Sequence, residues 1–337
     1  MGIDLPIIWA VIIALGVMIY IILDGFDLGI GILFPLIKDR EQRDQMVNTV
    51  APVWDGNETW LVLGGAALMA AFPVAYSVIL SALYLPLILM LVGLIWRGVA
   101  FEFRFKAHIV EHRKFWDKAF FFGSLLATFC QGITMGSLVQ GINTSDGVYV
   151  GGMLDWLSPF SLVCGFGLVA TYALLGSTWL IMKTSGRLQQ LMCSYAQPLT
   201  MILLAFIALV SIWTPLMSDA IKTRWFSLPH FWWFLPVPLL TLFTSWQLIK
   251  SVKLSPSYQP FLATLILIFL GYSGLIISLW PTIVPPNISL IAASSPPQSQ
   301  GFALVGALLI IPMIIGYSAW SYYVFRGKVQ QGDGYHH

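Results

Sequence analysis

Long apolar runs recur along the whole sequence, and short polar segments separate them. An α-helix needs about 20 mostly apolar residues to cross the hydrocarbon core of a bilayer. We count about nine such spans, at approximately 6–36, 50–74, 77–97, 118–140, 158–182, 197–215, 229–249, 259–281 and 301–325. The pattern predicts an all-α, polytopic transmembrane helical bundle, with residues 1–337 forming a single transmembrane domain.

Composition supports the same class of protein. Of 337 residues, 58% are hydrophobic and only 9% are charged, whereas soluble domains carry about 25% charged residues. The three cysteines are far apart and form no CxxC motif, so no disulfide framework is indicated. The first apolar run has neither a basic segment before it nor a small-residue cleavage site, which favours a retained helix over a signal peptide.

The distribution of positive charge predicts the orientation. All but two of the 17 Lys and Arg residues fall on one side of the predicted spans, and the exceptions are Lys222 and Arg224. Arg97 is counted at the end of the third span on the positive side. Cytoplasmic loops carry the excess of Lys and Arg, so we expect an outside N-terminus and a cytoplasmic C-terminus.

One polar segment is expected to lack regular structure. The stretch VPPNISLIAASSPPQSQG, residues 284–301, precedes the last span and is rich in proline and serine. Clusters of this kind are typical of loops. The charge asymmetry places this loop on the outer side.

Four carboxyl groups lie in the first two spans. Asp24 and Asp27 belong to YIILDGFDLGIG, and Asp55 and Glu58 belong to VWDGNETW. Residues three apart share a helix face, and ionised carboxylates are costly against lipid, so these acids should face the protein interior or water. At about 1.5 Å per residue, Asp24 lies ~27 Å along the first helix. Both pairs are therefore expected in the cytoplasmic half of adjacent helices.

With Glu102, these acids form a candidate proton path. Glu102 lies in RGVAFEFRFK, at the cytoplasmic end of the third span. Buried carboxyl groups can take up and release protons, so the file could carry protons from the cytoplasm toward the membrane middle. A structural role stays open for each acid: Asp24 and Asp27 could pair with Arg97, and Asp55 could cap a helix that starts later than drawn.

Cofactor ligands are scarce in the spans. A haem-binding membrane subunit needs His or Met at membrane depth, and none of the histidines lies mid-span: His108, His112, His230, His336 and His337. We therefore expect no haem ligated by this chain. HIVEH matches the spacing of the HxxEH zinc motif, but it has no obvious third ligand and we expect no metal site. Trp54 and Trp60 flank the acids and could stack on a bound quinone.

Three motifs together resemble a known family. LDGFDLGIG, APVWDGNETWLVLGGAALMAAFP and WRGVAFEFR are similar to subunit II of cytochrome bd-type quinol oxidases. The resemblance covers the full chain, including the long first helix and the SLIAASSP region before the last span. The short chain, with brief loops between the later spans, looks like the cyanide-insensitive branch of the family.

The resemblance implies a respiratory enzyme of the bacterial cytoplasmic (inner) membrane. In such oxidases two large subunits form a heterodimer, and subunit I carries two b-type haems, haem d and the quinol site. Subunit II ligates none of these haems. The complex oxidises quinol at the outer face, reduces oxygen to water and takes the chemical protons from the cytoplasm. A small single-helix subunit would be a further partner, and no nucleic acid is implied.

The resemblance also implies roles for individual residues. Four positions match family acids tied to proton supply, namely Asp24, Asp27, Asp55 and Glu102. Glu102 stands where some members have Asp, which keeps the carboxyl group. Glu58 stands where some members have a neutral residue, and we include it in the path. Arg97 matches a recurrent Arg that is expected to set the charge balance of the acids.

The resulting hypothesis is a subunit that scaffolds subunit I and supplies it with protons. A proton-coupled secondary transporter is the alternative, because intramembrane acids and the GxxxG pattern of GFDLG fit it equally well on physical grounds. Such a transporter would act as a single gene product without haem. In a third reading the acids only stabilise helix packing, and mutating them would reduce assembly rather than rate.

Overall fold

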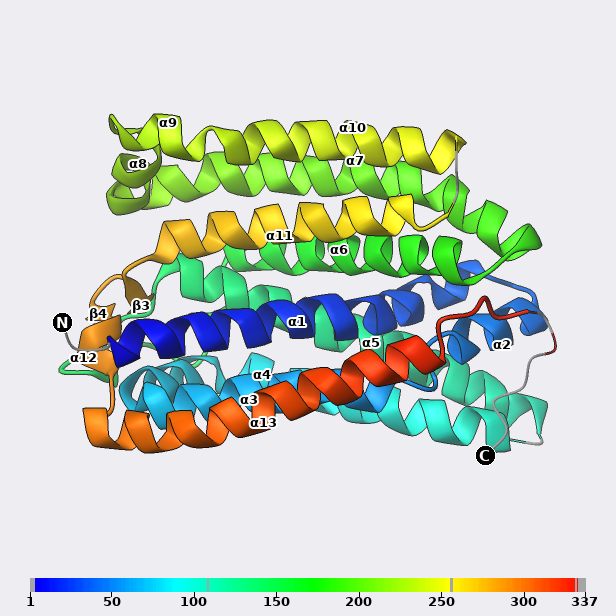
Figure 1. The fold of residues 1–337 in the computed structure, drawn as a ribbon, viewed down its shortest axis with the longest axis horizontal. Helices are drawn as coiled ribbons and strands as arrows, with labels where there is room; N and C mark the ends of the chain where they lie inside the picture. Colours follow the sequence, from blue (N-terminus) through cyan, green and yellow to red (C-terminus); the bar gives the residue numbers. More distant parts are fainter. Residues whose placement is uncertain (1–3, 108, 255–256, 331, 333–337) are drawn as a thin grey trace.

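The computed structural model describes residues 4–107, 109–254, 257–330 and 332, and its long helices run side by side (Figure 1). In chain order the helices are α1 (Leu5–Leu33), the 3-10 turn η1 (Phe34–Leu36), α2 (Arg40–Asn48), α3 (Trp54–Ala71), α4 (Pro73–Lys106), α5 (Val110–Gln140), α6 (Pro159–Lys183), α7 (Gly186–Met217), α8 (Asp219–Phe226), α9 (His230–Phe234), α10 (Pro236–Leu254), α11 (Gln259–Leu279), α12 (Leu290–Ala293) and α13 (Pro297–Val324). Two short hairpins, β1 (Thr144–Ser145) with β2 (Val148–Tyr149) and β3 (Thr282–Val284) with β4 (Ile288–Ser289), are antiparallel.

The predicted all-α transmembrane bundle is confirmed. Within the described residues, eight helical segments are long and apolar enough to cross a membrane. The remaining predicted span corresponds to α3, which has 18 residues and carries four polar residues, Asp55, Asn57, Glu58 and Thr59, in its first turns. These polar residues explain why α3 is less apolar than the other spans.

Several helices extend beyond the predicted spans, and this changes the position of Arg97. We expected Arg97 at the cytoplasmic end of its span, but α4 continues to Lys106. Arg97 is fully buried, so it is an interior residue of the bundle rather than a loop cation. The apolar run ends at Arg97 in the sequence, but α4 continues, and Arg97 is buried because its ion-pair partners Asp24 and Glu58 lie on neighbouring helices.

The central helix of the bundle is α1. It contacts α3, α5, α6, α11 and α13. In Figure 1, α7 and α10 form one edge of the molecule and α3, α4 and α13 form the opposite edge, with α6, α11, α1 and α5 between them. Side chains on different faces of α1 therefore reach most of the bundle.

Small residues allow α1 and α6 to approach closely. Lipid tails are as apolar as leucine, so membrane helices associate through van der Waals packing and favour small residues where they meet. A Cβ atom added to Gly29 would lie 1.8 Å from the backbone oxygen of Tyr172, and one added to Gly176 would lie 2.6 Å from the Gly29 carbonyl carbon. The GFDLG segment of α1 therefore lies in close backbone contact with α6.

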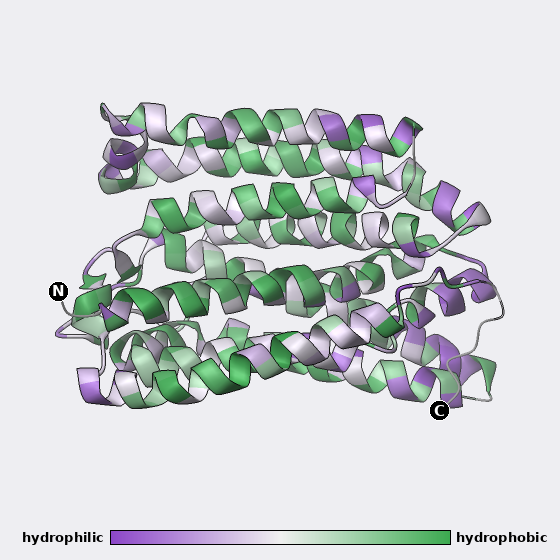
Figure 2. Cartoon of the chain, in the orientation of Figure 1, coloured by the Kyte–Doolittle hydropathy of each residue, from purple (hydrophilic) through white to green (hydrophobic). Residues whose placement is uncertain are grey.

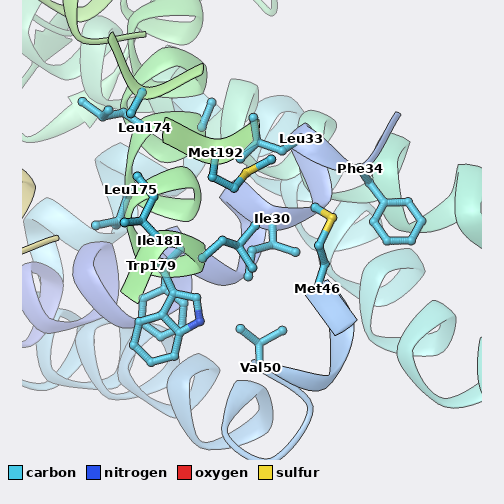
Figure 3. Packing of buried hydrophobic residues seen from close by; sticks show 14 of the residues in the cluster. Ile30, Leu33, Phe34, Met46, Val50, Leu174, Leu175, Trp179, Ile181 and Met192 are labelled. Atoms are coloured by element: carbon cyan, nitrogen blue, oxygen red, sulfur yellow. The ribbon is translucent and has the colours of Figure 1, made fainter. Parts of the chain in front are cut away.

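An aromatic and aliphatic core fills the end of the bundle beside α2 (Figure 3). Ile30 and Leu33 of α1 pack there with Met46 of α2. The ring of Phe26 stacks on that of Trp179 of α6, with ring centroids 4.1 Å apart. This packing fixes the rotation of α1 and so determines where its two acids point.

The two ends of the bundle differ in polarity. Figure 2 shows hydrophilic residues gathered around α2 and the start of α5, at the end that the charge pattern identifies as cytoplasmic.

At the outer end, residues 284–301 are not the irregular loop that we expected, because they include β4 and α12. The Ser289 hydroxyl accepts a hydrogen bond from the Ala292 amide at 3.2 Å and caps α12. Serine thus starts a helix here rather than extending a loop.

The segment after α13 is tied to the cytoplasmic end of α6. Lys183 donates hydrogen bonds from Nζ to the backbone oxygens of Phe325 and Gly327. In return, Lys328 donates to the backbone oxygen of Thr184 at 2.9 Å. The last carbonyl groups of a helix lack partners inside it. Lys183, in the last turn of α6, therefore caps the end of α13. Lys328, which follows α13, caps the end of α6.

Candidate functional site

A buried ion cluster joins three helices in the cytoplasmic half of the bundle. Asp24 of α1 pairs with Nη2 of Arg97 on α4, and both side chains are 0% exposed. The same nitrogen lies 3.2 Å from Oε1 of Glu58 on α3, whose side chain is 28% exposed. The structure therefore brings together residues that the sequence only placed in the same half of adjacent helices.

The Arg97 guanidinium has few other partners. Among the described residues, its buried Nε and Nη1 atoms have no hydrogen-bond partner. Its central carbon lies 5.7 Å from the Trp54 ring centroid and 5.8 Å from that of Phe101, and these two rings stack on each other. Aromatic faces attract a guanidinium and hold its plane. The arrangement directs one nitrogen toward the acids.

The second acid of α1, Asp27, has a different environment. It is fully buried. Its Oδ2 accepts a hydrogen bond from Nδ2 of Asn57 at 2.8 Å, and its Oδ1 has no hydrogen-bond partner in the part of the chain that the structure describes. Asn57 in turn accepts a hydrogen bond from the Tyr322 hydroxyl of α13 at 2.8 Å. Asn57 and Tyr322 were not identified from the sequence, because an amide and a tyrosine in apolar runs carry no signal of their own.

Charge counting limits the protonation of this cluster. It contains three carboxyl groups, Asp24, Asp27 and Glu58, and one guanidinium, Arg97. Full ionisation would leave two uncompensated negative charges in the protein interior. Unpaired buried charges are neutralised by protonation rather than tolerated. A proton bound by any of the three carboxyl groups would lower this uncompensated charge by one.

A pocket of about 270 Å³ lies beside the cluster, between α3, the end of α4 and α13. It is lined by Ala51, Pro52, Val53, Trp54, Asp55, Gly56, Asn57, Glu102, Tyr317, Ser318, Ser321 and Tyr322. Its lining includes Asp55, which is exposed, and Asn57, which holds Asp27. The pocket thus extends from water to the residue that contacts a buried acid.

Asp55 and Glu102 lie at this pocket rather than in the ion cluster. Asp55 is in the first turn of α3, and Val53 is the N-cap residue, so the capping alternative for Asp55 is wrong. Glu102 pairs with the exposed Lys106 at 3.4 Å, one turn further along α4, and lines the pocket. All six acidic and basic candidates therefore lie in or beside one site, in two groups joined by Asn57.

A second charged network lies nearer the cytoplasmic end. Arg104 of α4 contacts Asp117 of α5 and Asp44 of α2, each at 2.7 Å. Arg43 of α2 contacts Asp117 at 3.0 Å, and Arg113 of α5 also pairs with Asp44. The sequence showed these residues only as loop charges. Their pairing ties α2, α4 and α5 together beside the pocket.

The described histidines lie near helix starts, and Trp54 and Trp60, the candidates for stacking on a quinone, lie on α3. Among the described histidines, His112 lies in the first turn of α5 and His230 begins α9, so neither is in the interior of the bundle. His108, the first residue of HIVEH, lies outside the described residues, as do His336 and His337. Trp54 stacks on Phe101, and Trp60 is 2% exposed. The absence of a haem ligand in this chain stays a prediction.

Fold and site together define a polytopic membrane subunit with a buried ion cluster next to a cytoplasmic pocket. The profile of the family described as cytochrome bd terminal oxidase subunit II matches residues 5–325, and the chain belongs to this family. It is a multi-pass protein of the bacterial inner membrane and part of a terminal quinol oxidase complex, an oxidoreductase in which it has a subunit I as its partner.

Individual relatives agree over nearly the full length. The chain is 28% identical to cytochrome bd-I ubiquinol oxidase subunit 2 of Escherichia coli K12, covering 98% of this chain and 96% of the relative. It is 29% identical to cytochrome bd ubiquinol oxidase subunit 2 of Bacillus subtilis 168, covering 96% and 97%. A solved structure of bd oxidase from Geobacillus thermodenitrificans matches with a TM-score of 0.79 at 15% identity, covering 96% of this chain and 99% of that one. The transporter alternative gains no support from these comparisons.

Proposed function

We propose that this chain conducts protons from the cytoplasm to the oxygen-reducing site in subunit I and contains no redox centre of its own. The observation that carries this proposal is the hydrogen bond at 2.8 Å between Asn57, which lines the cytoplasmic pocket, and the buried acid Asp27. It connects a water-accessible space to a carboxyl group inside the membrane domain. Intramembrane acids of this kind mark proton relays.

The first step of the path uses water in the pocket. A single water needs about 10–15 Å³ of accessible space and several polar partners, and the pocket offers about 270 Å³ with Asp55, Glu102 and hydroxyl groups in its lining. Carboxylates at the mouth attract protons from the cytoplasm. Pocket water then passes a proton to Asp27, while the Asn57 amide, which cannot itself exchange a proton easily, holds that carboxyl group in place.

The ion cluster keeps the buried acids ready for transfer. Arg97 contacts both Asp24 and Glu58 and compensates one of the three carboxylate charges, so one bound proton leaves the cluster with a single net negative charge. Loss or gain of a proton then changes the net charge of the cluster by one unit. Such a change is tolerable next to a guanidinium and prohibitive without one.

The redox cofactors belong to subunit I in this proposal. We expect two b-type haems and haem d there, together with the site that oxidises quinol. Neither described histidine offers an axial ligand in the bundle interior, which supports this division. A small single-helix subunit and a bound quinone remain expectations of the family resemblance, as does membership of the cyanide-insensitive branch.

Turnover of isosteric variants in the assembled two-subunit complex tests the path. Asp55→Asn at the pocket mouth and Asp27→Asn in the interior should each slow oxygen consumption several-fold, because each removes a carboxyl group that carries the proton. The rate is expressed per assembled complex, which the reduced-minus-oxidised haem spectrum counts. Asp146→Asn is the matched control, because Asp146 lies exposed in the outer β1–β2 turn.

Two outcomes would contradict the proposal. Normal turnover per haem in both Asp55→Asn and Asp27→Asn would remove the proton path. A loss of assembled complex, with normal turnover in what remains, would show that the acids only stabilise packing. The expected result is a normal haem spectrum with slow turnover in the two path variants and neither effect in Asp146→Asn.

A further inference from the structure

The charged groups at the cytoplasmic end of the bundle fall into two different regions. Around α2, α4 and α5 the cations pair with carboxylates, and the ion pairs of the described residues all lie between residues 24 and 117. Residues 156–332, by contrast, contain one acidic residue, Asp219, which begins α8 at the outer end. The cytoplasmic ends of α6, α7, α10 and α13 therefore carry cations without any acid of their own.

One exposed face of α10 combines apolar, aromatic and basic side chains in that order. Residues three or four apart share a helix face, and such a row runs through Leu239, Leu242, Phe243, Trp246, Lys250 and Lys253. All six side chains are exposed in this chain. The row ends at the cytoplasmic end of α10, on the same side of the molecule as α2 (Figure 1). It therefore runs from the depth of lipid acyl chains to the depth of lipid headgroups.

Two contacts join the apolar part of this row to its basic part. Nζ of Lys250 lies 5.1 Å from the centroid of the Trp246 ring. The centroid of the Trp246 ring lies 5.9 Å from that of Phe243. Tryptophan is enriched at the level of the headgroups, and lysine extends its charged end from apolar surface toward water. The row therefore places an ammonium group next to an aromatic ring at the level where lipid phosphates lie.

The helices around α10 leave the charges of Lys250 and Lys253 uncompensated. The helices that pack against α10 are α7, α9 and α11. None of these three contains an acidic residue, and the ion pairs of the described residues include neither lysine. Anionic lipids of the cytoplasmic leaflet attract basic segments next to a membrane helix. Charge complementarity therefore identifies the partner of this face as an anionic lipid.

We propose that this face of α10 binds one anionic phospholipid of the cytoplasmic leaflet. Its phosphate contacts Lys250 and Lys253, and its acyl chains lie along Phe243 and Leu242. The two lysines select an anionic headgroup, and the apolar part of the row selects a lipid over a soluble phosphate. Because α10 lies at the edge of the bundle opposite the pocket (Figure 1), this site is separate from the ion cluster and does not depend on the proton path.

Native mass spectrometry of the assembled complex in a mild detergent counts bound lipids directly. The probes are dioleoylphosphatidylglycerol, which is anionic, and dioleoylphosphatidylcholine, which has the same acyl chains and no net charge. The wild-type complex should retain phosphatidylglycerol in preference to phosphatidylcholine. In Lys250→Gln/Lys253→Gln, the affinity for the tightest phosphatidylglycerol should fall roughly fivefold for each lysine removed. Its binding of phosphatidylcholine should not change.

Lys114→Gln/Lys118→Gln is the matched control. These two lysines are exposed at the same cytoplasmic end and share one face of α5, so the change removes the same charge. Glu111 lies on that face as well, three residues before Lys114. Lipid binding by this variant should equal that of the wild type. Lys250→Arg/Lys253→Arg keeps both charges and should retain phosphatidylglycerol. The haem spectrum confirms that each variant complex is assembled.

Several results would overturn the proposed site. Equal weakening in the two glutamine double variants would show a general attraction to the positive end of the bundle. Unchanged binding in Lys250→Gln/Lys253→Gln, or equal binding of both lipids by the wild type, would remove the selective site on α10. Displacement of the lipid by glycerol 3-phosphate, which lacks acyl chains, would show that the lysines recognise a soluble anion. A protein that copurifies only when both lysines are intact would replace the lipid as the occupant.

Discussion

Arg97 is the residue on which the charge balance of the site depends. One of its nitrogens contacts both Asp24 and Glu58, and aromatic rings lie near its guanidinium group. Desolvating ions inside a protein is expensive, and only close pairing offsets the cost. A lysine at this position could not reproduce the planar contact with the rings. The site is therefore most sensitive to this side chain.

Arg97→Gln should destabilise the complex by about 3–5 kcal/mol, because it leaves Asp24 as an uncompensated buried carboxyl group. The measurement is the thermal unfolding of the purified complex, together with its yield. Arg326→Gln, which changes an exposed arginine after α13, is the control and should have little effect. Adding Asp24→Asn to Arg97→Gln should recover part of the loss. A stable single variant without any recovery in the double variant would contradict the pairing.

At the scale of elements, close helix contact depends on glycines whose surroundings differ. On α1, Gly29 lies against the α6 backbone, whereas Gly16 has no atom within 4 Å of its added Cβ. Gly29→Ala should cost about 1–3 kcal/mol, because backbone atoms cannot move aside as a side chain could. Gly16→Ala should be neutral or stabilise by up to about 1 kcal/mol through lower backbone entropy. Thermal unfolding compares the two, and equal effects would contradict the contact.

The reciprocal lysine caps give a second prediction at this scale. Lys183→Met keeps an apolar stem over Trp179 but removes the donor to two carbonyl groups after α13. An intramolecular hydrogen bond contributes about 0.5–1.5 kcal/mol net, so the loss of these two bonds should loosen the end of α13. Limited proteolysis should then cleave the segment after α13 faster than in wild type. Lys250→Met, which alters a lysine at the end of α10, should leave the cleavage rate unchanged.

The sequence predicted the helices well and their ends less well. Apolar runs indicate a span because length and hydrophobicity are local properties. Arg97 was placed too near the surface, since a buried ion pair depends on a partner elsewhere in the chain. The same limit applies to Asn57 and Tyr322, because what each side chain does depends on its neighbours on other helices. The acids stood out because a carboxyl group in an apolar run needs an explanation by itself.

For the whole molecule, the site lies toward one edge of the bundle. The pocket is between α3, α4 and α13, while α7 and α10 form the opposite edge (Figure 1). In α13 none of the most apolar window is buried within this chain. A proton that leaves Asp27 for a haem in subunit I should cross as little apolar bundle as possible. The edge nearest the site, formed by α3, α4 and α13, is therefore the expected contact with subunit I.

Site-specific photo-crosslinking distinguishes the two edges. A photoreactive amino acid at Met313 on α13, which is 73% exposed in the isolated chain, should crosslink to subunit I in membranes. The same probe at Leu242 on α10, which is 63% exposed, should react with lipid and give no subunit I product. Both positions are apolar and have similar exposure, so each controls for the other. A subunit I product only from Leu242 would place the partner across the bundle from Asp27. The proton would then have to cross the close contact between α1 and α6, where Gly29 and Gly176 bring the two backbones together.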